Sequence, residues 1–256
     1  MAGGRSYKTE AIVLRSFRLG EADRVLHLYT LERGRVGAVA KGIRRTKSRF
    51  GARLEPLSHV EILLHQGAGE LHTVTGVDLV RSHRAAREEP YRLGVGLVGL
   101  EAMLRLFSEQ EANPRAFEAL VRFLDLLDEA PGPGESRGKA RGEARAALDP
   151  LVLAFQLKLL WLSGYLPHLG SCAECGSSKP FVGYSAKAGG AVCADCAGGT
   201  LALSPAGLAG IDGLLRRPLA EAGAVGINER AAREALAVVN ASYEYHGGFR
   251  LRTASA

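Results

Sequence analysis

The sequence lacks the features of membrane-spanning and secreted proteins. No apolar run approaches the roughly 20 residues that a helix needs to cross a bilayer. Residues 1–5 lack the charged start, apolar stretch and small-residue cleavage site of a signal peptide. Only four of the 256 residues are cysteine, and we do not expect four thiols to form a disulfide framework in a reducing compartment. These absences predict a cytoplasmic protein with no membrane attachment.

Motifs for nucleotide binding and for catalysis are also missing. Residues 94–99 have the glycine spacing of a dinucleotide-binding loop, but residues 88–90 (Glu-Glu-Pro) stand where the preceding strand would have to be. Lys139 is followed by Ala140 instead of the Ser or Thr of a phosphate-binding loop. No G-x-S-x-G or H-E-x-x-H sequence is present. We therefore expect no ATP site and no catalytic residues.

Positive charge is in excess, and it is concentrated in the first third of the chain. The whole chain carries a formal net charge of +6. Residues 1–84 contain 15 Lys and Arg against 8 Asp and Glu, whereas the remaining residues contain 18 against 19. A concentrated positive field favours polyanions, which usually means nucleic acid or a membrane surface. The alternative is a solvated surface whose charge bias arose by chance.

Five apolar segments in the first third predict β-strands separated by glycine-containing turns. They are residues 7–17, 25–29, 36–40, 60–64 and 71–80. No helical period lies between them. Five strands in about 75 residues suit a small closed barrel, and an OB-type barrel matches in size. Barrels of this type commonly bind single-stranded nucleic acid.

The apolar period becomes helical from Ala85 onward. The predicted helices are residues 91–107, 114–127, 144–162, 205–215 and 229–245. Asn113-Pro114 and Ser204-Pro205 each place a capping side chain before a proline at the first helical position. Residues 130–142 are rich in proline and glycine and read as a loop between helices.

All four cysteines lie where the helical pattern stops, between residues 167 and 199. Cys172-Ala-Glu-Cys175 and Cys193-Ala-Asp-Cys196 are two C-x-x-C pairs separated by 17 residues, which is the spacing of a zinc ribbon. Each pair can point both sulfurs at one metal, and four thiolates leave no coordination position open. The spacing predicts one structural Zn²⁺, the alternatives being two redox pairs or four unrelated buried thiols.

Two neighbours of the first pair bear on this prediction. Gly176 suits a tight turn in which backbone N–H groups approach the thiolate of Cys175. His168 lies four residues before Cys172 and could replace a ligand. With four cysteines available, we expect His168 to be a surface or packing residue.

The predicted fold class is α+β, with an N-terminal five-stranded OB-type β-barrel, a helical domain, and a zinc-ribbon-like module with four cysteines inserted in the helical region. We place the OB-fold nucleic-acid-binding domain at residues 1–80 and the first part of the helical domain at 81–166. The zinc-binding module follows at 167–200, and the second part of the helical domain at 201–256.

The strongest candidate for DNA contact is a basic segment after the third predicted strand. Five positive charges fall within nine residues that contain no acid: Lys41, Arg44, Arg45, Lys47 and Arg49. Arg and Lys on an exposed loop can bind phosphates, and the alternative is a solvated loop.

Two further residues near this segment are candidates. Phe50, at its end, could stack on a base or anchor the core. Arg24 follows a polar turn between the first two strands, and we include it among the DNA-binding candidates. Glu21 and Asp23 in that turn could orient Arg24, although a plain hairpin would have the same sequence.

Several strings of residues together resemble one known family. Residues 7–14, 20–26 and 40–49 are similar to the N-terminal segments of the bacterial RecO family of recombination mediators. Residues 164–172, leading into the C-x-x-C pairs, resemble the same family's entry into its zinc module. The resemblance spans nearly the whole chain, and it implies an OB-fold domain, a helical domain and a zinc-binding insertion.

The resemblance also implies a function in recombinational DNA repair. It implies ATP-independent binding of single- and double-stranded DNA, annealing of complementary strands, and help in loading the recombinase RecA. The implied partners are RecR and the single-strand-binding protein. Because some members of the family lack the cysteines, it implies that zinc supports structure instead of chemistry. The alternative is a zinc-ribbon enzyme that acts on nucleic acid, such as a nuclease.

Overall fold

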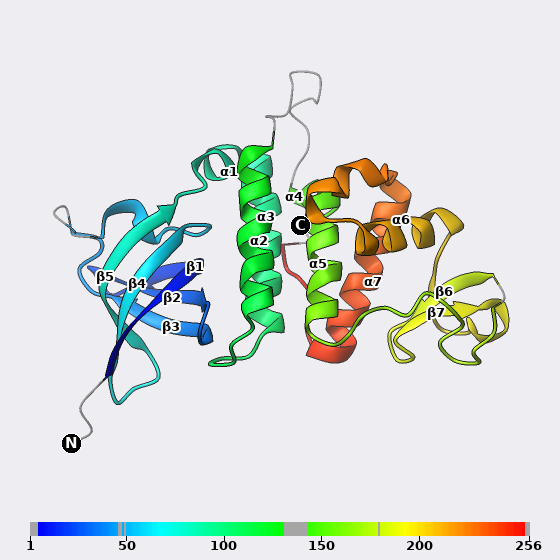
Figure 1. Ribbon diagram of the computed structural model, residues 1–256, viewed down its shortest axis with the longest axis horizontal. Coiled ribbons are helices and arrows are strands. Elements are labelled where there is room, and N and C mark those ends of the chain that lie inside the picture. Colours follow the sequence, from blue (N-terminus) through cyan, green and yellow to red (C-terminus); the bar gives the residue numbers. More distant parts are fainter. Residues whose placement is uncertain (1–4, 46–47, 49, 131–142, 179, 254–256) are drawn as a thin grey trace. The chain divides into compact units, whose positions relative to one another are not determined.

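The computed structural model describes residues 5–45, 48, 50–130, 143–178 and 180–253 (Figure 1). Its strands are β1 (Arg5–Leu19), β2 (Asp23–Thr30), β3 (Gly34–Ala40), β4 (His59–Gln66), β5 (His72–Arg81), β6 (Phe181–Ser185), β7 (Gly190–Cys193) and β8 (Leu201–Ala202). Its α-helices are α1 (Arg84–Glu88), α2 (Pro90–Leu106), α3 (Pro114–Glu129), α4 (Glu143–Ala146), α5 (Pro150–Leu162), α6 (Pro205–Arg216) and α7 (Glu229–Gly247). Short 3₁₀ helices are η1 (Gly51–Leu54), η2 (Ala194–Cys196) and η3 (Leu219–Val225).

The chain forms two compact units. The first contains residues 1–89 and 103–128, and the second contains residues 90–102 and 129–256. The first unit therefore combines the barrel strands with α3, whereas the second combines the remaining long helices with β6, β7 and β8. This grouping differs from the predicted domains, which placed the residues of α3 in the helical domain and not with the barrel. Where independently folding domains begin and end stays a prediction.

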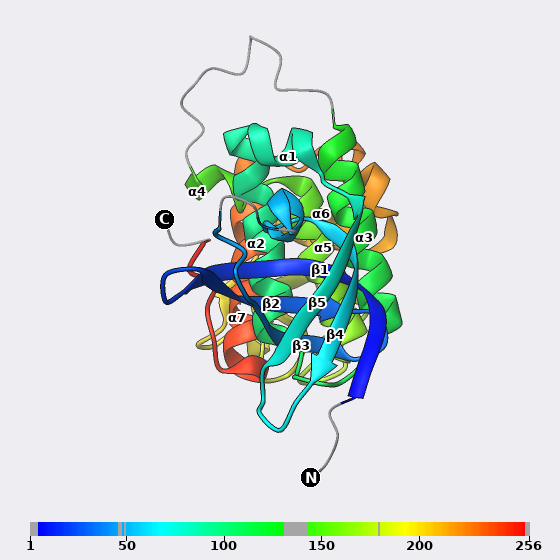
Figure 2. The same cartoon turned by 90° about the vertical axis from the view of Figure 1, so that its left-hand side faces the viewer.

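The first unit is built on a closed barrel with the strand order β1-β2-β3-β5-β4 (Figure 2). β3 and β5 are parallel, and the other neighbouring strands are antiparallel. Alternate residues of β3 are buried, so Val36, Ala38 and Ala40 fill the interior. This is the five-stranded architecture that the sequence predicts, and the strand order is that of an OB-type barrel.

A bulge in β1 decides which side chains of that strand face outward. Val13 lies opposite Leu28 of β2, but Arg15 lies opposite the next residue of β2, His27. Leu14 is therefore an extra residue in β1, and it interrupts the alternation of faces. Val13 belongs to the barrel core, whereas Arg15 is exposed beyond the bulge.

α3 is fastened to the barrel by the buried side chain of His83. Its Nδ1 atom lies 2.7 Å from the carbonyl oxygen of Leu57, and its Nε2 atom lies 3.0 Å from Oδ1 of Asp125 in α3. Each ring nitrogen of His83 thus has an acceptor oxygen within hydrogen-bond distance. Asp128, one turn later in α3, accepts a hydrogen bond from the backbone N–H of Ala86 at 2.9 Å.

The second unit is organised around α5, whose residues 152–157 and 159–160 are all buried. α5 contacts α6, α7 and η3, which explains why its sequence is apolar on every side. β7, β6 and β8 form a small antiparallel sheet in that order. A hydrogen bond of 2.8 Å between the hydroxyls of Tyr184 in β6 and Ser242 in α7 ties this sheet to the helices.

Two of the predicted helix starts are confirmed and one predicted helix is wrong. Asn113 accepts from the backbone N–H of Ala116 at 3.0 Å, and Ser204 accepts from that of Gly207 at 3.0 Å. The single helix predicted for residues 144–162 is instead two, α4 and α5. Asp149 accepts from Leu151 N–H at 2.8 Å before Pro150, and this cap starts a new helix.

The glycine-rich pattern at residues 94–99 lies within α2, as expected for a packed helix face. A Cβ atom on Gly94 would lie 3.2 Å from Cβ of Ala146, so the missing side chain permits close packing. Among the residues described, no helix has both the length and the apolar character required to cross a bilayer. The predicted fold class is confirmed by the barrel, the helices and the clustered cysteines.

Replacing His83 tests how firmly α3 is fastened. We expect His83→Ala to lower the free energy of unfolding by about 3 kcal/mol, because it leaves a cavity and removes the contacts with the Leu57 carbonyl and with Asp125. Urea unfolding of the full chain measures the change. His65→Ala removes a histidine of β4 that bonds the exposed hydroxyl of Ser6, and it should cost about 0.5 kcal/mol or less. Equal losses of stability in both variants would contradict the assignment.

Candidate metal centre and nucleic-acid interface

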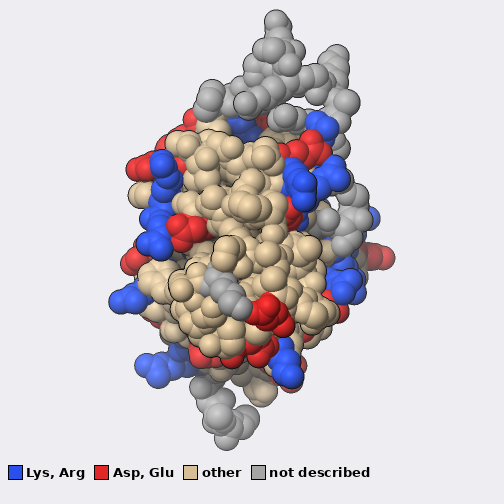
Figure 3. All heavy atoms as spheres, turned by 90° about the vertical axis from the view of Figure 1, so that its right-hand side faces the viewer, with Lys and Arg blue, Asp and Glu red and all other residues tan. Residues whose placement is uncertain are grey.

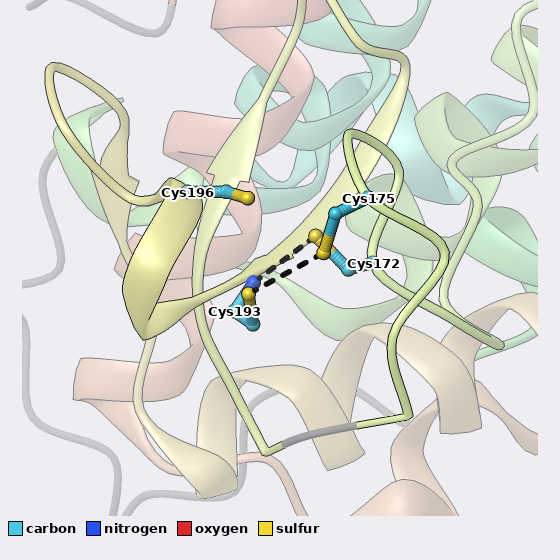
Figure 4. Close-up of side chains that lie close together, drawn as sticks. All are labelled: Cys172, Cys175, Cys193 and Cys196. Atoms are coloured by element: carbon cyan, nitrogen blue, oxygen red, sulfur yellow. Dashed lines mark hydrogen bonds between the residues drawn. The ribbon is translucent and has the colours of Figure 1, made fainter.

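The four cysteines of the two C-x-x-C pairs come together in one cluster. Their sulfurs all lie within 4.8 Å of one another, and Figure 4 shows the side chains of both pairs meeting. Cys172 and Cys175 precede β6, whereas Cys193 ends β7 and Cys196 ends η2. All four are free thiols, so the cluster holds no disulfide. A set of four sulfurs at this spacing can hold a metal ion.

Backbone geometry at the first pair supports this arrangement. Gly176 has a φ of +72°, which favours glycine, and its N–H donates to the carbonyl of Cys172 at 2.8 Å. The N–H of Cys193 points at the sulfur of Cys172 from 3.4 Å. These tight turns place both sulfurs of each pair on the same side, as the spacing predicts.

The thiols of the cluster differ in acidity because of what surrounds each sulfur. Backbone N–H groups of Cys175 and Cys193 stabilise the thiolate and lower the pKa of Cys172 to about 6. The neighbouring sulfur of Cys175 raises the pKa of Cys196 to about 12. Several adjacent thiolates repel one another, so the four cannot all ionise at neutral pH without a cation. The donor set therefore fits a bound divalent ion, which would replace the thiol protons.

His168 is not part of the cluster and instead stabilises a turn. Its Nε2 atom lies 2.8 Å from the hydroxyl of Ser171 and accepts from the N–H of Ser171 at 3.1 Å. Its carbonyl oxygen accepts from the N–H of Ala191 at 2.8 Å. His168 is exposed, so the expectation of a surface or packing residue is confirmed.

The basic segment after β3 begins as a turn beside the β1–β2 hairpin. Asp23 accepts a hydrogen bond from the N–H of Gly42 at 2.7 Å, and Ala22 accepts from the N–H of Arg44 at 2.9 Å. The guanidinium of Arg44 donates to the carbonyl of Glu21 at 2.7 Å. The two loops therefore lie together at one end of the barrel.

The candidate DNA-binding residues in this segment differ in their exposure to solvent, and two of them are not described. Lys41, Arg44 and Arg45 are exposed. Lys47 and Arg49 lie outside the described residues. Phe50 is only 1% exposed and belongs to the barrel core, so its alternative role as a base-stacking residue is wrong.

Arg24 is oriented by a residue that the sequence did not indicate. Its Nη1 atom lies 2.9 Å from Oε1 of Glu55 and 3.4 Å from the hydroxyl of Ser16. The suggestion that Glu21 or Asp23 orients Arg24 is therefore wrong. The ion pair holds Arg24 opposite Ala40, the last residue of β3 before the basic segment. Its contact with DNA stays a prediction.

Charged residues of the second unit are arranged differently. Five arginines there pair with nearby acids: Arg216 with Asp212, Arg217 with Glu221, Arg230 with Glu234, Arg233 with Glu229, and Arg250 with Glu244. Figure 3 shows one face of this unit, where Lys and Arg lie beside Asp and Glu around a largely uncharged centre. Such a face has no concentrated positive field.

Three exposed or partly exposed residues on the barrel were missed by sequence reasoning: Arg15, Phe17 and His27. The rings of Phe17 and His27 are 5.6 Å apart, and the guanidinium of Arg15 lies 5.8 Å from the centre of the Phe17 ring. A strict alternation of apolar and polar residues would have indicated the outer face, but the bulge at Leu14 breaks that signal.

Comparison with known proteins gives a consistent result over nearly the whole chain. Residues 1–83 match the family model described as "Recombination protein O N terminal", and residues 142–254 match "Recombination protein O C terminal". The chain is similar to a protein of Rubrobacter xylanophilus named "DNA repair protein RecO", with 40% identity over 84% of this chain and 83% of the relative. Proteins of the same name from Thermobifida fusca and Streptomyces coelicolor are 40% and 37% identical. The alignment with the Thermobifida fusca protein covers 94% of this chain and 93% of the relative. The alignment with the Streptomyces coelicolor protein covers 94% of both.

Proposed function

The chain belongs to the RecO family of DNA repair proteins, and from this premise we propose that it is a non-catalytic, DNA-binding mediator of recombinational repair. In this proposal it binds single- and double-stranded DNA, anneals complementary strands without ATP and helps to load a recombinase. RecR and the single-strand-binding protein are its proposed partners, and the cytoplasm is its proposed location.

The observation that carries the proposal is the group of cations at one end of the barrel. Lys41 and Arg45 are exposed, and no ion pair is found for either among the described residues. The guanidinium of Arg44 reaches backbone carbonyls, not a carboxylate, so its charge is not neutralised. Cations held without acidic partners attract phosphates, whatever the base sequence.

The charge pattern of the second unit supports a different role for the helices. The residues of this unit, 90–102 and 129–256, carry 14 Lys and Arg against 12 Asp and Glu. Four of the arginines pair with an acid four residues away: Arg216, Arg217, Arg230 and Arg233. This balance is poor for binding a polyanion and suits a scaffold with protein partners. We therefore assign DNA binding to the barrel and protein contacts to the helices.

We also propose that the cysteine cluster binds one structural Zn²⁺. Sulfurs about 2.3 Å from a central zinc ion form a tetrahedron with edges of about 3.8 Å. The sulfurs of Cys175 and Cys193 are 3.8 Å apart. Four thiolates would complete the coordination shell, so a bound ion would hold the segment before β6 to β7 and η2 and would have no position for a substrate.

Replacement of one ligand tests the zinc assignment. Cys193→Ser should release zinc from the purified full chain and destabilise the small sheet, because metal binding supplies local folding energy. Elemental analysis measures the zinc, and hydrogen exchange of residues 5–81 should remain as in the original chain. His168→Ala, which changes the neighbouring non-ligand, should keep its zinc. Purified protein without zinc, or loss of zinc only in His168→Ala, would refute the assignment.

Replacement of two unpaired cations tests the phosphate contacts. Each neutralised phosphate releases counterions, so Lys41→Ala with Arg45→Ala should lower the salt slope of log K by about 1.4 on single strands, at about 0.7 for each cation removed. Titrations of a fluorescent oligonucleotide across a salt series measure the slope. Arg216→Ala with Arg230→Ala removes two acid-paired arginines and should leave the slope unchanged. Equal slopes in both double variants would exclude the segment from the DNA site.

The central experiment is annealing of complementary oligonucleotides, monitored by fluorescence in the absence of nucleoside triphosphates. We expect the full chain to accelerate annealing and to leave both strands intact. Strand cleavage that depends on a divalent metal would instead identify a nuclease and overturn the proposal. Binding without acceleration of annealing would remove the annealing function from it.

A further inference from the structure

We propose that the outer face of β1, β2 and β3 beyond the bulge is a stacking site for the bases of single-stranded DNA, centred on Phe17 and His27. This inference rests on the proposed DNA-binding function and adds to it a separate contact for the bases. The phosphate contacts assigned to Lys41, Arg44 and Arg45 cannot distinguish single strands from duplex DNA, whereas a base-stacking site can.

The two rings lie side by side on adjacent strands. Phe17 is opposite Val25 and Arg15 is opposite His27, so Phe17 and His27 occupy neighbouring positions of one face. Their ring centres are 5.6 Å apart and their planes differ by 34°. Phe17 is 42% exposed and is the only strongly exposed aromatic side chain among the described residues of the first unit. An exposed aromatic face of this kind can take up an unstacked base.

The face continues across β3 at Gly37 and ends at Leu71. Gly37 is opposite His27 and has no side chain, and the side chain of Leu71 lies over it. A Cβ atom on Gly37 would come within 2.7 Å of Cδ2 of Leu71. Leu71 is itself 44% exposed, so the row from Phe17 to Leu71 is an open apolar surface. Neighbouring strands are about 4.8 Å apart, which lets successive bases settle on successive strands.

Charge on this face favours a polyanion. Arg15 lies over the Phe17 ring, and no carboxylate partner is found for it within the described part of the chain. Arg35 and Glu109 also face His27, but they pair with each other at 3.2 Å and offset one another. Burial, Arg35 and Arg15 lower the pKa of His27, so its ring is neutral at pH 7 and presents a π face.

The opposite side of the barrel also has exposed apolar residues, but no exposed aromatic ring is found there among the described residues, and Lys8 on that side is paired with an acid. Leu63 and Leu79 on β4 and β5 are exposed to a similar degree, at 39% and 44%. Glu61 on β4 pairs with Lys8 at 2.6 Å, and Asp78 on β5 is exposed. Nucleic acid is therefore favoured on the side of Phe17. Duplex DNA keeps its bases stacked inside, so only single strands can use the rings.

The test compares binding of an oligothymidylate of about 16 nucleotides with binding of a duplex of equal length. Loss of base–aromatic stacking costs about 1–3 kcal/mol, so Phe17→Ala should weaken single-strand binding by roughly 5- to 150-fold. Duplex affinity and the salt slope should stay unchanged. Tyr245→Ala removes an exposed aromatic ring from α7, 56% exposed, and should change neither affinity.

Two further variants separate stacking from packing. Phe17→Leu keeps the apolar cover over Val25 and should still lose most of the single-strand affinity, because it lacks a ring. Phe17→Trp, made together with Trp161→Phe so that it carries the sole tryptophan, should retain affinity. Its indole fluorescence should be quenched by oligothymidylate.

The outcomes distinguish this inference from the proposed function. If the original chain binds neither DNA form, the proposed function fails. If it binds both and Phe17→Leu binds oligothymidylate as the original chain does, only the stacking site is refuted. Equally weakened binding of single strands and duplex in Phe17→Leu would likewise refute it and would indicate a general effect on the barrel. Unchanged DNA binding with loss of RecR binding would show that the face serves a protein partner.

Discussion

The bulge at Leu14 is the constraint on which the outer surface of the barrel depends. β1 must close the barrel by pairing with β4 through its first half and with β2 through its second half. Strict alternation along fifteen residues would turn Arg15 and Phe17 inward after Val13. The extra residue reverses the side of the sheet to which the following side chains point. Val13 therefore stays in the core, while Arg15 and Phe17 reach solvent. The same local irregularity that allows closure therefore creates the exposed aromatic face.

Packing of residues 103–128 decides which part of that face stays open. Phe107 contacts Tyr29 with ring centres 5.5 Å apart, and Glu109 pairs with Arg35. These contacts cover the outer side of β2 and β3 next to the β2–β3 turn. The part next to Phe17 remains exposed, and Leu71 lies over Gly37. The fastening of α3 through His83 thus bears on the proposed stacking site as well as on stability, because the helix is held on the barrel where it leaves this surface free.

Features that depend on short-range chemistry could be predicted from the sequence. The spacing of the cysteines predicted their cluster, and Asn113-Pro114 and Ser204-Pro205 predicted two helix starts. Features that depend on packing could not. The bulge at Leu14 has no residue signature, and the burial of Phe50 follows from barrel closure. The cap at Asp149 was present in the sequence as the same Asx-Pro device, but a continuous apolar pattern across it concealed the break between α4 and α5.

In the proposed function, affinity for DNA and preference for its single-stranded form have different physical origins in this barrel. Phosphates are common to every form of DNA, so Lys41 and Arg45 can supply affinity but no preference. The bases of a duplex stack on one another and cannot contact the rings. Phe17 and His27 can therefore supply a preference for single strands that depends little on salt. An annealing protein has to hold single strands and then release a duplex. Separate sites for phosphates and bases meet this requirement, because pairing of the bases withdraws them from the rings while the phosphate contacts remain.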